Sequence, residues 1–585
     1  MSDAQPQAAF RRQNPILWSL VLPAAIVLIL YAATFLLLPR TGVWINDNGC
    51  RFIQMLGLIR SGSAAYDIPW PGATLDPAFI YNPLPDPFGH VIDGKLYAQY
   101  SPLFALIASL FYRLLGDDGI YVLPFAGGIL TLPAVWCLAG QLTESRLARA
   151  TAVLLVGLAT PMWFYAMTFW ELTTAACLTT WSLAFLLGAL DSGRAARLWP
   201  AAILCGLAIA FRDVLYILAG VMTLAVFLNS RPRWRGTVIF ASALVVTLIP
   251  IWWFQWQSLG HPLGLHFSAH GPMEFGVSHY LAGRWTTFRQ LFVDSHEGLA
   301  ASLFLSTPAV LLMFWCPRLS RGTLSRLVPT LAAIAGLAGA VILVGHLTAE
   351  YPVWWLRRSK SLFAASPVLI LAFVRLKQTR VKDEHEVANR RRESARKMLW
   401  LIFLAYGLLY ALAAPSFTTA GIHWGCRYLM PAYPMLATLA AVTLAQWWRR
   451  RPGQWRLAMA PIAIALAMSV VMQVYSLGLL HQRKAFSAAL NQIVADRDEE
   501  VIIARGFFMP PELFRSFYDK PIFLLSERQR IRPLMTALAG AGYRRALYVG
   551  DRPCEAGTLR DRTILSDGLG FLTVELRPLA LTTTP

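Results

Sequence analysis

Long apolar segments, separated by short polar ones, make up most of the chain. Two of them, residues 16–38 and 327–347, reach the roughly 20 apolar residues that a helix needs to cross a bilayer, and similar runs recur along the sequence. Reading the crossings from hydropathy predicts about thirteen transmembrane helices. This pattern is typical of an all-α polytopic membrane protein.

Lysine and arginine residues gather in alternate loops between the apolar runs, as the positive-inside rule requires of cytoplasmic loops. By this rule Arg11 and Arg12 place the N-terminus in the cytoplasm. The other predicted cytoplasmic anchors are Arg146 and Arg149, Arg194 and Arg197, residues 231–235, Arg318, Arg321 and Arg326, residues 375–397, and residues 447–456.

Four substantial segments are then predicted on the external face: residues 39–118, 257–298, 347–360, and everything after about residue 481. In the first segment, apolar side chains recur at helical spacing between Phe52 and Ile59, with polar ones between them. This spacing predicts a helix that lies in the membrane interface. Residues 101–115 are too few for a full crossing and predict a second juxtamembrane helix.

The tail of the chain changes in composition. Residues 499–507, 520–526 and 544–551 predict short buried strands, and the helix-like residues 509–518 and 528–542 separate them. We therefore expect a transmembrane domain over residues 1–480 and a small external α/β domain over residues 481–585. On this topology the protein is a multi-pass protein of the inner (plasma) membrane, with these segments facing the periplasm or the exterior.

Composition agrees with a membrane protein. Of the 585 residues, 56% are hydrophobic and 14% are charged, which is too apolar for a set of soluble domains. The net charge of +20 lies in the short segments between apolar runs, so it reports topology and not nucleic-acid binding. The seven cysteines are scattered, and only Cys50 and Cys426, each in a Gly-Cys-Arg triplet, are candidates for a disulfide.

Two acidic residues occur where acids are costly, at the edge of the hydrocarbon region. Asp47 follows the first apolar run closely, and Glu171 lies at the predicted external end of a later one. Each has a purely structural alternative. Asp47, followed by Asn48 and Gly49, fits a turn or a helix N-cap, and Glu171 fits a helix start, where a negative charge meets the positive end of the dipole.

Two arginines lie on the predicted external side, where the topology rule requires no cation. Arg212 separates two half-length apolar runs, and Arg427 begins a span. A guanidinium fork suits the oxygens of a lipid phosphate at the headgroup level. The alternatives are an ion pair with Asp213 or a neighbouring helix end for Arg212, and snorkelling to ordinary headgroups for Arg427.

A metal site has only weak support in the sequence. His266 and His270 have the i, i+4 spacing that can share a metal on a helix. The surrounding stretch, residues 261–276, contains proline and several glycines, which are unfavourable in a regular helix. A divalent metal therefore remains one possible cofactor without assigned ligands.

The arrangement of these features resembles the GT-C superfamily of integral-membrane glycosyltransferases. It consists of the early acid, the acid at an outer helix end, the arginine between short apolar runs, the late "RYLMPAYP" at residues 427–434 and the external tail. The nearest families are the protein O-mannosyltransferases and the aminoarabinose-lipid A transferases. On this resemblance, Asp47 matches the acid of the first external loop, Glu171 the later acid, and Arg427 the arginine of the late motif.

The sequence also departs from these families. They often carry Asp-Glu where this chain has Asp47-Asn48, and Lys-Pro-Pro where it has "QYSPLF" at residues 99–104. The resemblance does not carry over the identity of the acceptor.

The resemblance implies transfer of a sugar from a polyprenyl-phosphate donor to a hydroxyl group of a lipid, glycan or protein acceptor. Such a donor has a good leaving group, so the chemistry needs a base and cations for the departing phosphate. We assign Asp47 as the base, acting with inversion and held ionised by Arg51, and Glu171 as the group that orients Asp47 or the acceptor, directly or through a metal. Arg51, Arg212 and Arg427 are assigned to the phosphate. The alternative class is a transporter or flippase of lipid-linked substrates, whose intramembrane charges line a pathway.

Overall fold

The computed structural model describes ten stretches of the chain: residues 16–62, 66–230, 232–265, 277–292, 361–374, 386–413, 422–450, 455–526, 529–550 and 570–575. The expectations for Arg318, Arg321, Arg326, His266, His270 and residues 347–360 lie outside the described residues.

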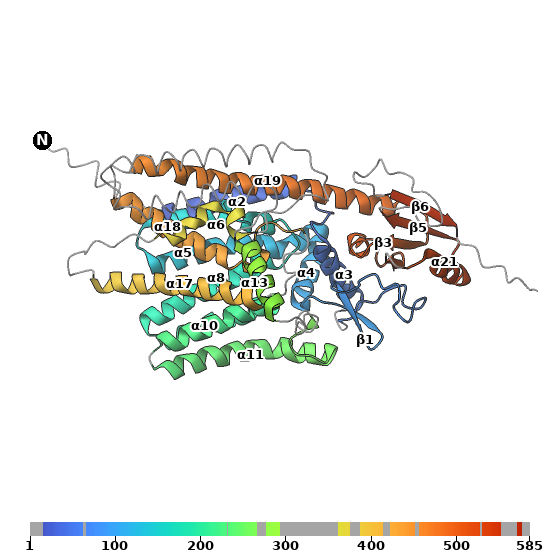
Figure 1. The fold of residues 1–585 in the computed structure, drawn as a ribbon, viewed down its shortest axis with the longest axis horizontal. Helices are drawn as coiled ribbons and strands as arrows, with labels where there is room; N and C mark the ends of the chain where they lie inside the picture. The colour runs from blue at the N-terminus through green and yellow to red at the C-terminus, as the bar shows by residue number, and fades with distance from the viewer. Residues whose placement is uncertain are drawn as a thin grey trace, which may run out of the picture.

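The described residues form an elongated bundle of helices with a small sheet domain at one end (Figure 1). The bundle helices are α2 (Leu22–Leu37, preceded by the π-turn Leu17–Val21), α5 (Val122–Leu142), α6 (Arg146–Leu158), α7 (Met162–Ala166), α8 (Leu172–Ser192), α9 (Leu198–Phe211), α10 (Tyr216–Asn229), α11 (Arg233–Leu259), α13 (Val277–Phe292), α16 (Leu362–Ala365), α17 (Glu386–Ala413), α18 (Ala432–Arg450) and α19 (Trp455–Ala495). Short 3₁₀ turns lie at Gly116–Tyr121, Ala195–Arg197, Asp213–Leu215, Pro367–Phe373 and Arg427–Leu429.

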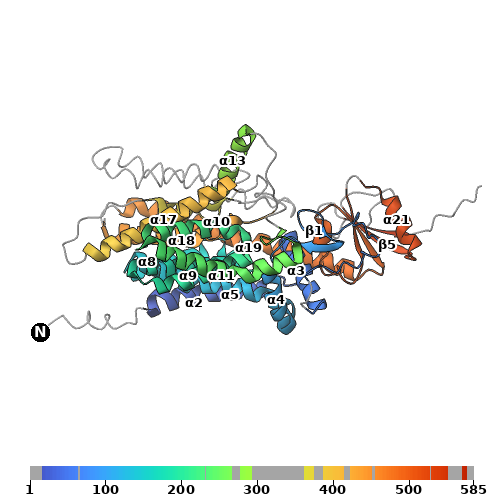
Figure 2. The same ribbon diagram turned by 90° about the horizontal axis from the view of Figure 1, so that it is seen from below.

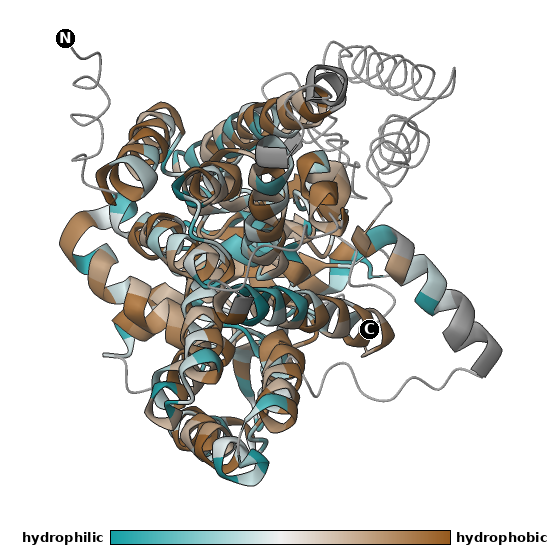
Figure 3. Ribbon diagram, turned by 90° about the vertical axis from the view of Figure 1, so that its left-hand side faces the viewer, coloured by the Kyte–Doolittle hydropathy of each residue, from teal (hydrophilic) through white to brown (hydrophobic). Residues whose placement is uncertain are grey.

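Six helices among the described residues are long and apolar enough to cross a membrane: Leu17–Leu37, Pro102–Leu142, Leu172–Ser192, Arg233–Leu259, Val387–Ala413 and Ile462–Ala495. Two shorter apolar helical segments, Ala195–Phe211 and Asp213–Asn229, accompany them. Viewed end on, hydrophobic residues cover much of the bundle (Figure 3), and large apolar side chains such as Leu36 and Trp234 are exposed, as expected for helices that face lipid. These features are those of a multi-pass membrane protein. The predicted count of about thirteen crossings includes segments that lie outside the described residues.

The segment between α2 and α5 contains the two short helices that the sequence predicts, α3 (Asn46–Arg60) and α4 (Pro102–Leu115). α4 ends at Gly116, whose φ of 60° turns the chain. The following Gly119 touches the last turns of α4 so closely that a Cβ would lie 2.1 Å from the Phe111 carbonyl oxygen. The chain therefore folds back on α4 before α5 begins.

The first of these helices does not have the exposed polar face expected of a helix in the membrane interface. α3 is enclosed by α4 and the C-terminal domain, and its polar residues Arg51 and Gln54 are as buried as its apolar ones. Two glycines permit this close packing, since a Cβ on Gly49 would lie 1.9 Å from the Pro511 carbonyl oxygen and one on Gly57 would lie 2.6 Å from the Tyr518 hydroxyl oxygen. The polar positions of α3 thus face the protein interior.

A β-hairpin, which the sequence did not predict, lies between α3 and α4. Strands β1 (Gly89–Ile92) and β2 (Lys95–Ala98) pair antiparallel, and both turn residues, Asp93 and Gly94, have positive φ, as a tight two-residue hairpin turn requires. At the open end of the hairpin, the backbone N–H of Gln99 donates to the Phe88 carbonyl oxygen at 3.1 Å. The hairpin therefore brings the residues that flank both of its strands together beside α3.

The C-terminal domain is a four-stranded sheet in the order β4-β3-β5-β6. Its strands are β3 (Val501–Arg505), β4 (Ile522–Leu525), β5 (Arg545–Gly550) and β6 (Gly570–Glu575), with helices α20 (Met509–Glu512) and α21 (Ile531–Gly540). β4, β3 and β5 are parallel and lie within the three predicted strands, whereas the antiparallel β6 was not predicted. The helix expected over residues 509–518 ends already at Glu512.

Helix α19 connects the bundle to this domain without a break, and it crosses the expected boundary at residue 480 (Figures 1 and 2). Near its C-terminal end, Arg483 forms a fully buried double hydrogen bond with Glu512 of α20, at 3.0 and 2.5 Å. Arg515 also pairs with Asp117 at 2.9 Å. The first contact fixes the C-terminal domain to α19, and the second fixes it to the segment that carries α3 and α4.

Candidate functional site

A cavity of about 360 Å³ lies where the helix ends, the hairpin and the C-terminal domain meet. Asp47, Arg51, Glu171, Arg212 and Arg427, the five residues that the sequence predicts, all line it. They come from α3, the start of α8, the break between α9 and α10, and the turn before α18. Residues that are 380 positions apart in the chain thus meet in one site.

Asp47 lies in the first turn of α3, and its carboxylate accepts two hydrogen bonds. The Tyr100 hydroxyl donates to Oδ1 at 2.9 Å, and Arg427 Nη1 donates to Oδ2 at 2.7 Å. The N-cap residue of α3 is Ile45, and no side chain makes a capping hydrogen bond there. The Asp47 carboxylate therefore does not cap the helix. Its oxygens are turned to the site instead.

The pKa of Asp47 reflects two opposing effects. Burial alone would raise it, but the charges of Arg427 and Arg51 and the hydrogen bonds from Tyr100 and Arg427 outweigh burial, so the pKa lies below its ordinary value. Tyr100 shows the opposite shift, because burial, and then the charge of Asp47, raise its pKa well above the usual value. At neutral pH this pair is therefore a carboxylate that accepts and a phenol that donates.

Glu171 is clamped by two arginines. Arg51 donates from Nε to Oε2 at 2.7 Å and from Nη2 to Oε1 at 2.9 Å, and Arg212 Nη1 donates to Oε1 at 2.9 Å. Although Glu171 occupies the N-cap position of α8, its side chain makes no capping hydrogen bond. The carboxylate is 4% exposed, so this is a buried, charge-assisted cluster.

Arg51 joins the two acidic residues. Besides clamping Glu171, it donates from Nη1 to the backbone oxygen of Asp47 at 3.0 Å, and its guanidinium lies over the Tyr100 ring at 3.8 Å. Arg51 therefore connects Glu171 to Asp47, and among the described hydrogen bonds none joins the two carboxylates directly.

Arg212 and Arg427 each had a purely structural alternative in the sequence, and the structure supports only the one for Arg212. Arg212 does pair at a neighbouring helix end, since Glu171 begins α8. Arg427 does not snorkel outward: it is buried, pairs with Asp47, and donates from Nη2 to the Tyr428 hydroxyl at 2.8 Å.

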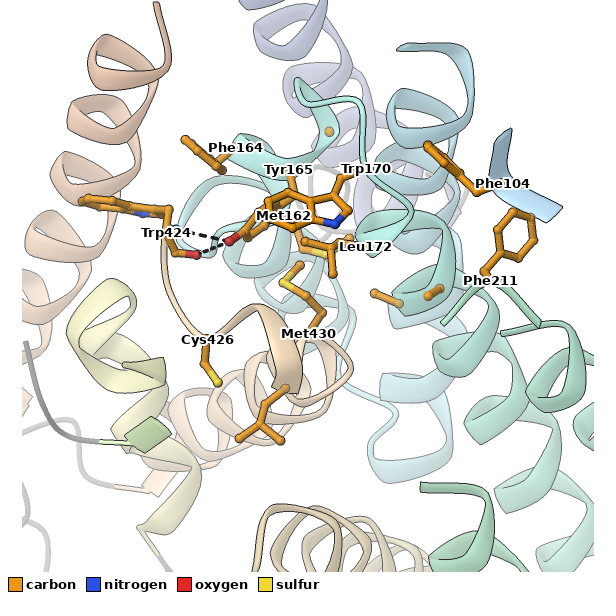
Figure 4. Close-up of a cluster of buried hydrophobic side chains, with 14 of the residues drawn as sticks. Phe104, Met162, Phe164, Tyr165, Trp170, Leu172, Phe211, Trp424, Cys426 and Met430 are labelled. Atoms are coloured by element: carbon orange, nitrogen blue, oxygen red, sulfur yellow. Dashed lines mark hydrogen bonds between the residues drawn. The ribbon is translucent and has the colours of Figure 1, made fainter. Parts of the chain in front are cut away.

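Among the aromatic residues of the site that were not predicted, Tyr100, Trp170 and Tyr428 contact its charged groups. Trp170 lies beside Tyr165 in the buried cluster of Figure 4, with ring centroids 5.7 Å apart. The Arg427 guanidinium lies 5.0 Å from the Trp170 ring. Two features of the sequence could have pointed to these residues. Trp170 and Tyr428 are the chain neighbours of Glu171 and Arg427, and Tyr100 lies in the "QYSPLF" stretch that departs from the family pattern.

The C-terminal domain supplies part of the cavity wall. Phe507 and Phe508 line it, and Phe507 stacks on Phe88 of the hairpin base at 5.9 Å. The Asn46 side chain donates to the Phe508 carbonyl oxygen, which ties this loop to the first turn of α3. The domain thus belongs to the site and does more than cover the bundle.

Neither a metal cluster nor a disulfide occurs within the described ranges. No three His, Cys, Asp or Glu residues come together there as metal ligands. Cys50 and Cys426 are both buried free thiols, so the possible disulfide between them is not formed.

No protein-family model matches the chain, and no curated protein matches it in sequence. Solved structures do resemble it. The archaeal oligosaccharyltransferase AglB from Archaeoglobus fulgidus, in complex with an inhibitory peptide and a dolichol-phosphate, has a TM-score of 0.46 at 12% identity and covers 90% of this chain and 69% of its own. ArnT from Cupriavidus metallidurans bound to undecaprenyl phosphate has a TM-score of 0.44 at 17% identity, and the match covers 97% of this chain and 99% of that chain. ArnT from the same organism in the apo state has a TM-score of 0.44 at 16% identity, and that match covers 90% of this chain and 92% of that chain. All three matches have identities below 25% and TM-scores below 0.5.

Proposed function

We propose that this protein is a glycosyltransferase that moves a sugar from a polyprenyl-phosphate donor to an acceptor hydroxyl at the external face of the membrane. The observation that carries the proposal is the convergence of Asp47, Glu171 and three arginines on one cavity at the ends of the apolar helices. An ionised carboxylate beside several guanidiniums is the pair of functions that this reaction needs: a base, and cations for a departing phosphate.

In the proposed step, Asp47 accepts the proton of the acceptor hydroxyl while the acceptor oxygen forms a bond to the anomeric carbon. The bond from that carbon to the phosphate oxygen breaks, and its electron pair leaves with the phosphate. Arg427, already 2.7 Å from Asp47, and Arg212 lie in position to receive this charge. A single displacement of this kind inverts the anomeric centre.

Glu171 and Arg51 have positioning roles in this mechanism. Both oxygens of Glu171 accept hydrogen bonds from arginines, so the carboxylate holds Arg51 and Arg212 in fixed orientations at the cavity wall. Arg51 then holds the backbone at Asp47 and, by its charge, favours the ionised carboxylate. Phe88 at the hairpin base and Phe507 of the C-terminal domain line the same cavity.

The alternative, a flippase for lipid-linked substrates, predicts movement of the lipid without bond cleavage. The test is to incubate the purified protein with polyprenyl-phosphate sugars labelled in the sugar, together with a membrane extract, and to identify the labelled product. Label in a lipid, glycan or protein acceptor names the acceptor class and supports the transferase. Intact donor that has only changed leaflet in proteoliposomes would instead assign the protein to transport.

A further inference from the structure

Three N–H donors at the cavity are buried and have no hydrogen-bond partner among the described residues: Trp170 Nε1, Arg212 Nε and Arg427 Nε. All three residues line the same cavity, and each is at least nine-tenths buried. A buried donor without an acceptor is costly, so native proteins rarely keep one unless a ligand or water completes it. Here three such donors occur at one site.

The three donors share one chemical preference. Indole and guanidinium N–H groups donate but do not accept, so they match a ligand that presents only acceptor oxygens. An acceptor hydroxyl both donates and accepts, whereas the non-bridging oxygens of a phosphate only accept. The set of unpaired donors therefore fits a phosphate better than it fits a sugar or an acceptor hydroxyl.

Trp170 differs from the two arginines because contacts with its neighbours already fix the indole ring. Its indole packs edge to face against Tyr165 (Figure 4), with Arg427 5.0 Å and Arg51 5.7 Å from the ring. Tyr165 is itself fixed, because its hydroxyl donates to the Trp424 carbonyl oxygen at 2.8 Å. The indole ring is thus held in place beside two guanidiniums, and its N–H has no acceptor among the described residues.

We infer that Trp170 is a ligand of the donor phosphate: its indole N–H donates to a non-bridging phosphate oxygen, alongside the Nε–H groups of Arg212 and Arg427. The inference rests on the proposed function, because it assigns a further residue to the phosphate of the same lipid. It also explains why the ring is tryptophan here, since phenylalanine would give the same stacking without the hydrogen bond.

The test variant is Trp170→Phe, which keeps an aromatic ring between the arginines and removes the N–H. Polyprenyl phosphate, polyprenol, inorganic phosphate and phosphatidylglycerol are titrated into the detergent-solubilised full chain, and binding is followed by ligand-induced thermal shift. Loss of one hydrogen bond to a charged group predicts about tenfold or more weaker binding of polyprenyl phosphate. Binding of the phosphate-free polyprenol is expected to stay the same.

Trp136→Phe is the matched control, because it removes an indole that donates to Ser19 Oγ at 3.0 Å away from the cavity. It should bind both lipids as the wild type does. A second measurement follows the indole ¹⁵N–H resonance that is missing in Trp170→Phe, which should move when polyprenyl phosphate is added to the wild type and stay in place with polyprenol.

Each outcome has a distinct meaning. Wild-type affinity of Trp170→Phe for polyprenyl phosphate, or an unmoved indole resonance, overturns the role of Trp170 and leaves the proposed function standing. A wild-type protein that binds polyprenyl phosphate no better than phosphatidylglycerol overturns both. Equal binding of inorganic phosphate and polyprenyl phosphate, each weakened in the variant, supports the indole contact and shows that the site reads the phosphate alone.

Discussion

Replacing Asp47 by asparagine separates the base from the scaffold, because the two side chains have nearly the same shape. In the protein, Asp47 accepts from Tyr100 at 2.9 Å and from Arg427 at 2.7 Å. An asparagine offers one oxygen and one NH₂ group in place of two acceptors; with its oxygen toward Arg427, its NH₂ group can donate to the Tyr100 hydroxyl, which accepts as well as donates. The variant therefore loses the basic oxygen and the negative charge that strengthens the hydrogen bond with Arg427, and keeps the rest.

Two magnitudes follow. A hydrogen bond to a charged group contributes about 1.5–3 kcal/mol, and the pair is only 15% and 10% exposed, so a stability loss of that order is expected. A general base contributes roughly 10²–10⁴-fold to the rate, which corresponds to about 3–5 kcal/mol of barrier. The catalytic loss should thus exceed what destabilisation alone produces in a protein that still folds.

The assay combines thermal unfolding in detergent, titration with polyprenyl phosphate, and sugar transfer to the product identified for the wild type. Asp47→Asn should unfold somewhat earlier, bind the phosphate lipid at least as well because a negative charge has gone, and lose transfer by 10²–10⁴-fold. The control is Asp118→Asn, which breaks another Asp–Arg pair of the same length, at 2.7 Å with Arg40, away from the cavity. Near-normal transfer by folded Asp47→Asn protein would remove this residue from the mechanism.

Three further predictions concern the partners of the site. Tyr100→Phe removes a hydrogen bond that lowers the pKa of Asp47, so the acidic limb of the pH profile of kcat/KM should move to higher pH; an unmoved limb would separate this hydroxyl from the base. Glu171→Gln leaves buried guanidiniums without their counter-charge and should destabilise the fold by about 3–5 kcal/mol in thermal unfolding, and no loss would contradict the clamp. Glu512→Gln breaks the 1% exposed pair with Arg483 and should make the C-terminal domain more sensitive to proteolysis, with transfer reduced alongside; resistance equal to wild type would show that other contacts hold the domain.

The site residues could be found from the sequence because charge near the hydrocarbon region is costly. Asp47, Glu171, Arg212 and Arg427 stand out against apolar surroundings for that reason, and all four line the cavity. Their pairing could not be predicted. The Asp47–Arg427 contact joins residues 380 positions apart, and only the packing of the helices decides which acid meets which arginine.

The aromatic donors were missed for the opposite reason. Tyr100 and Trp170 are ordinary residues of an apolar, aromatic-rich chain, so nothing in their composition separates a ligand from a core side chain. The same ambiguity explains the error on α3. Alternation between apolar and polar positions predicts a half-exposed helix, but Arg51 and Gln54 are polar because they face the site and the hairpin, not because they face water.

The formal charges of the five predicted residues can be compared with those of the proposed donor. Three guanidiniums, of Arg51, Arg212 and Arg427, face the two carboxylates of Asp47 and Glu171, which leaves one net positive charge. A sugar linked through a phosphodiester carries one negative charge, and the two sum to zero. After transfer the lipid phosphate is a monoester with a charge of about −1.5 to −2. In the proposed step Asp47 has by then taken up the acceptor proton, so the five residues carry two positive charges, and Arg427 has lost its anionic partner just as the phosphate gains charge. In the proposed mechanism, the proton that moves to Asp47 therefore frees Arg427 for the leaving phosphate, so that a single ion pair couples the two halves of the reaction.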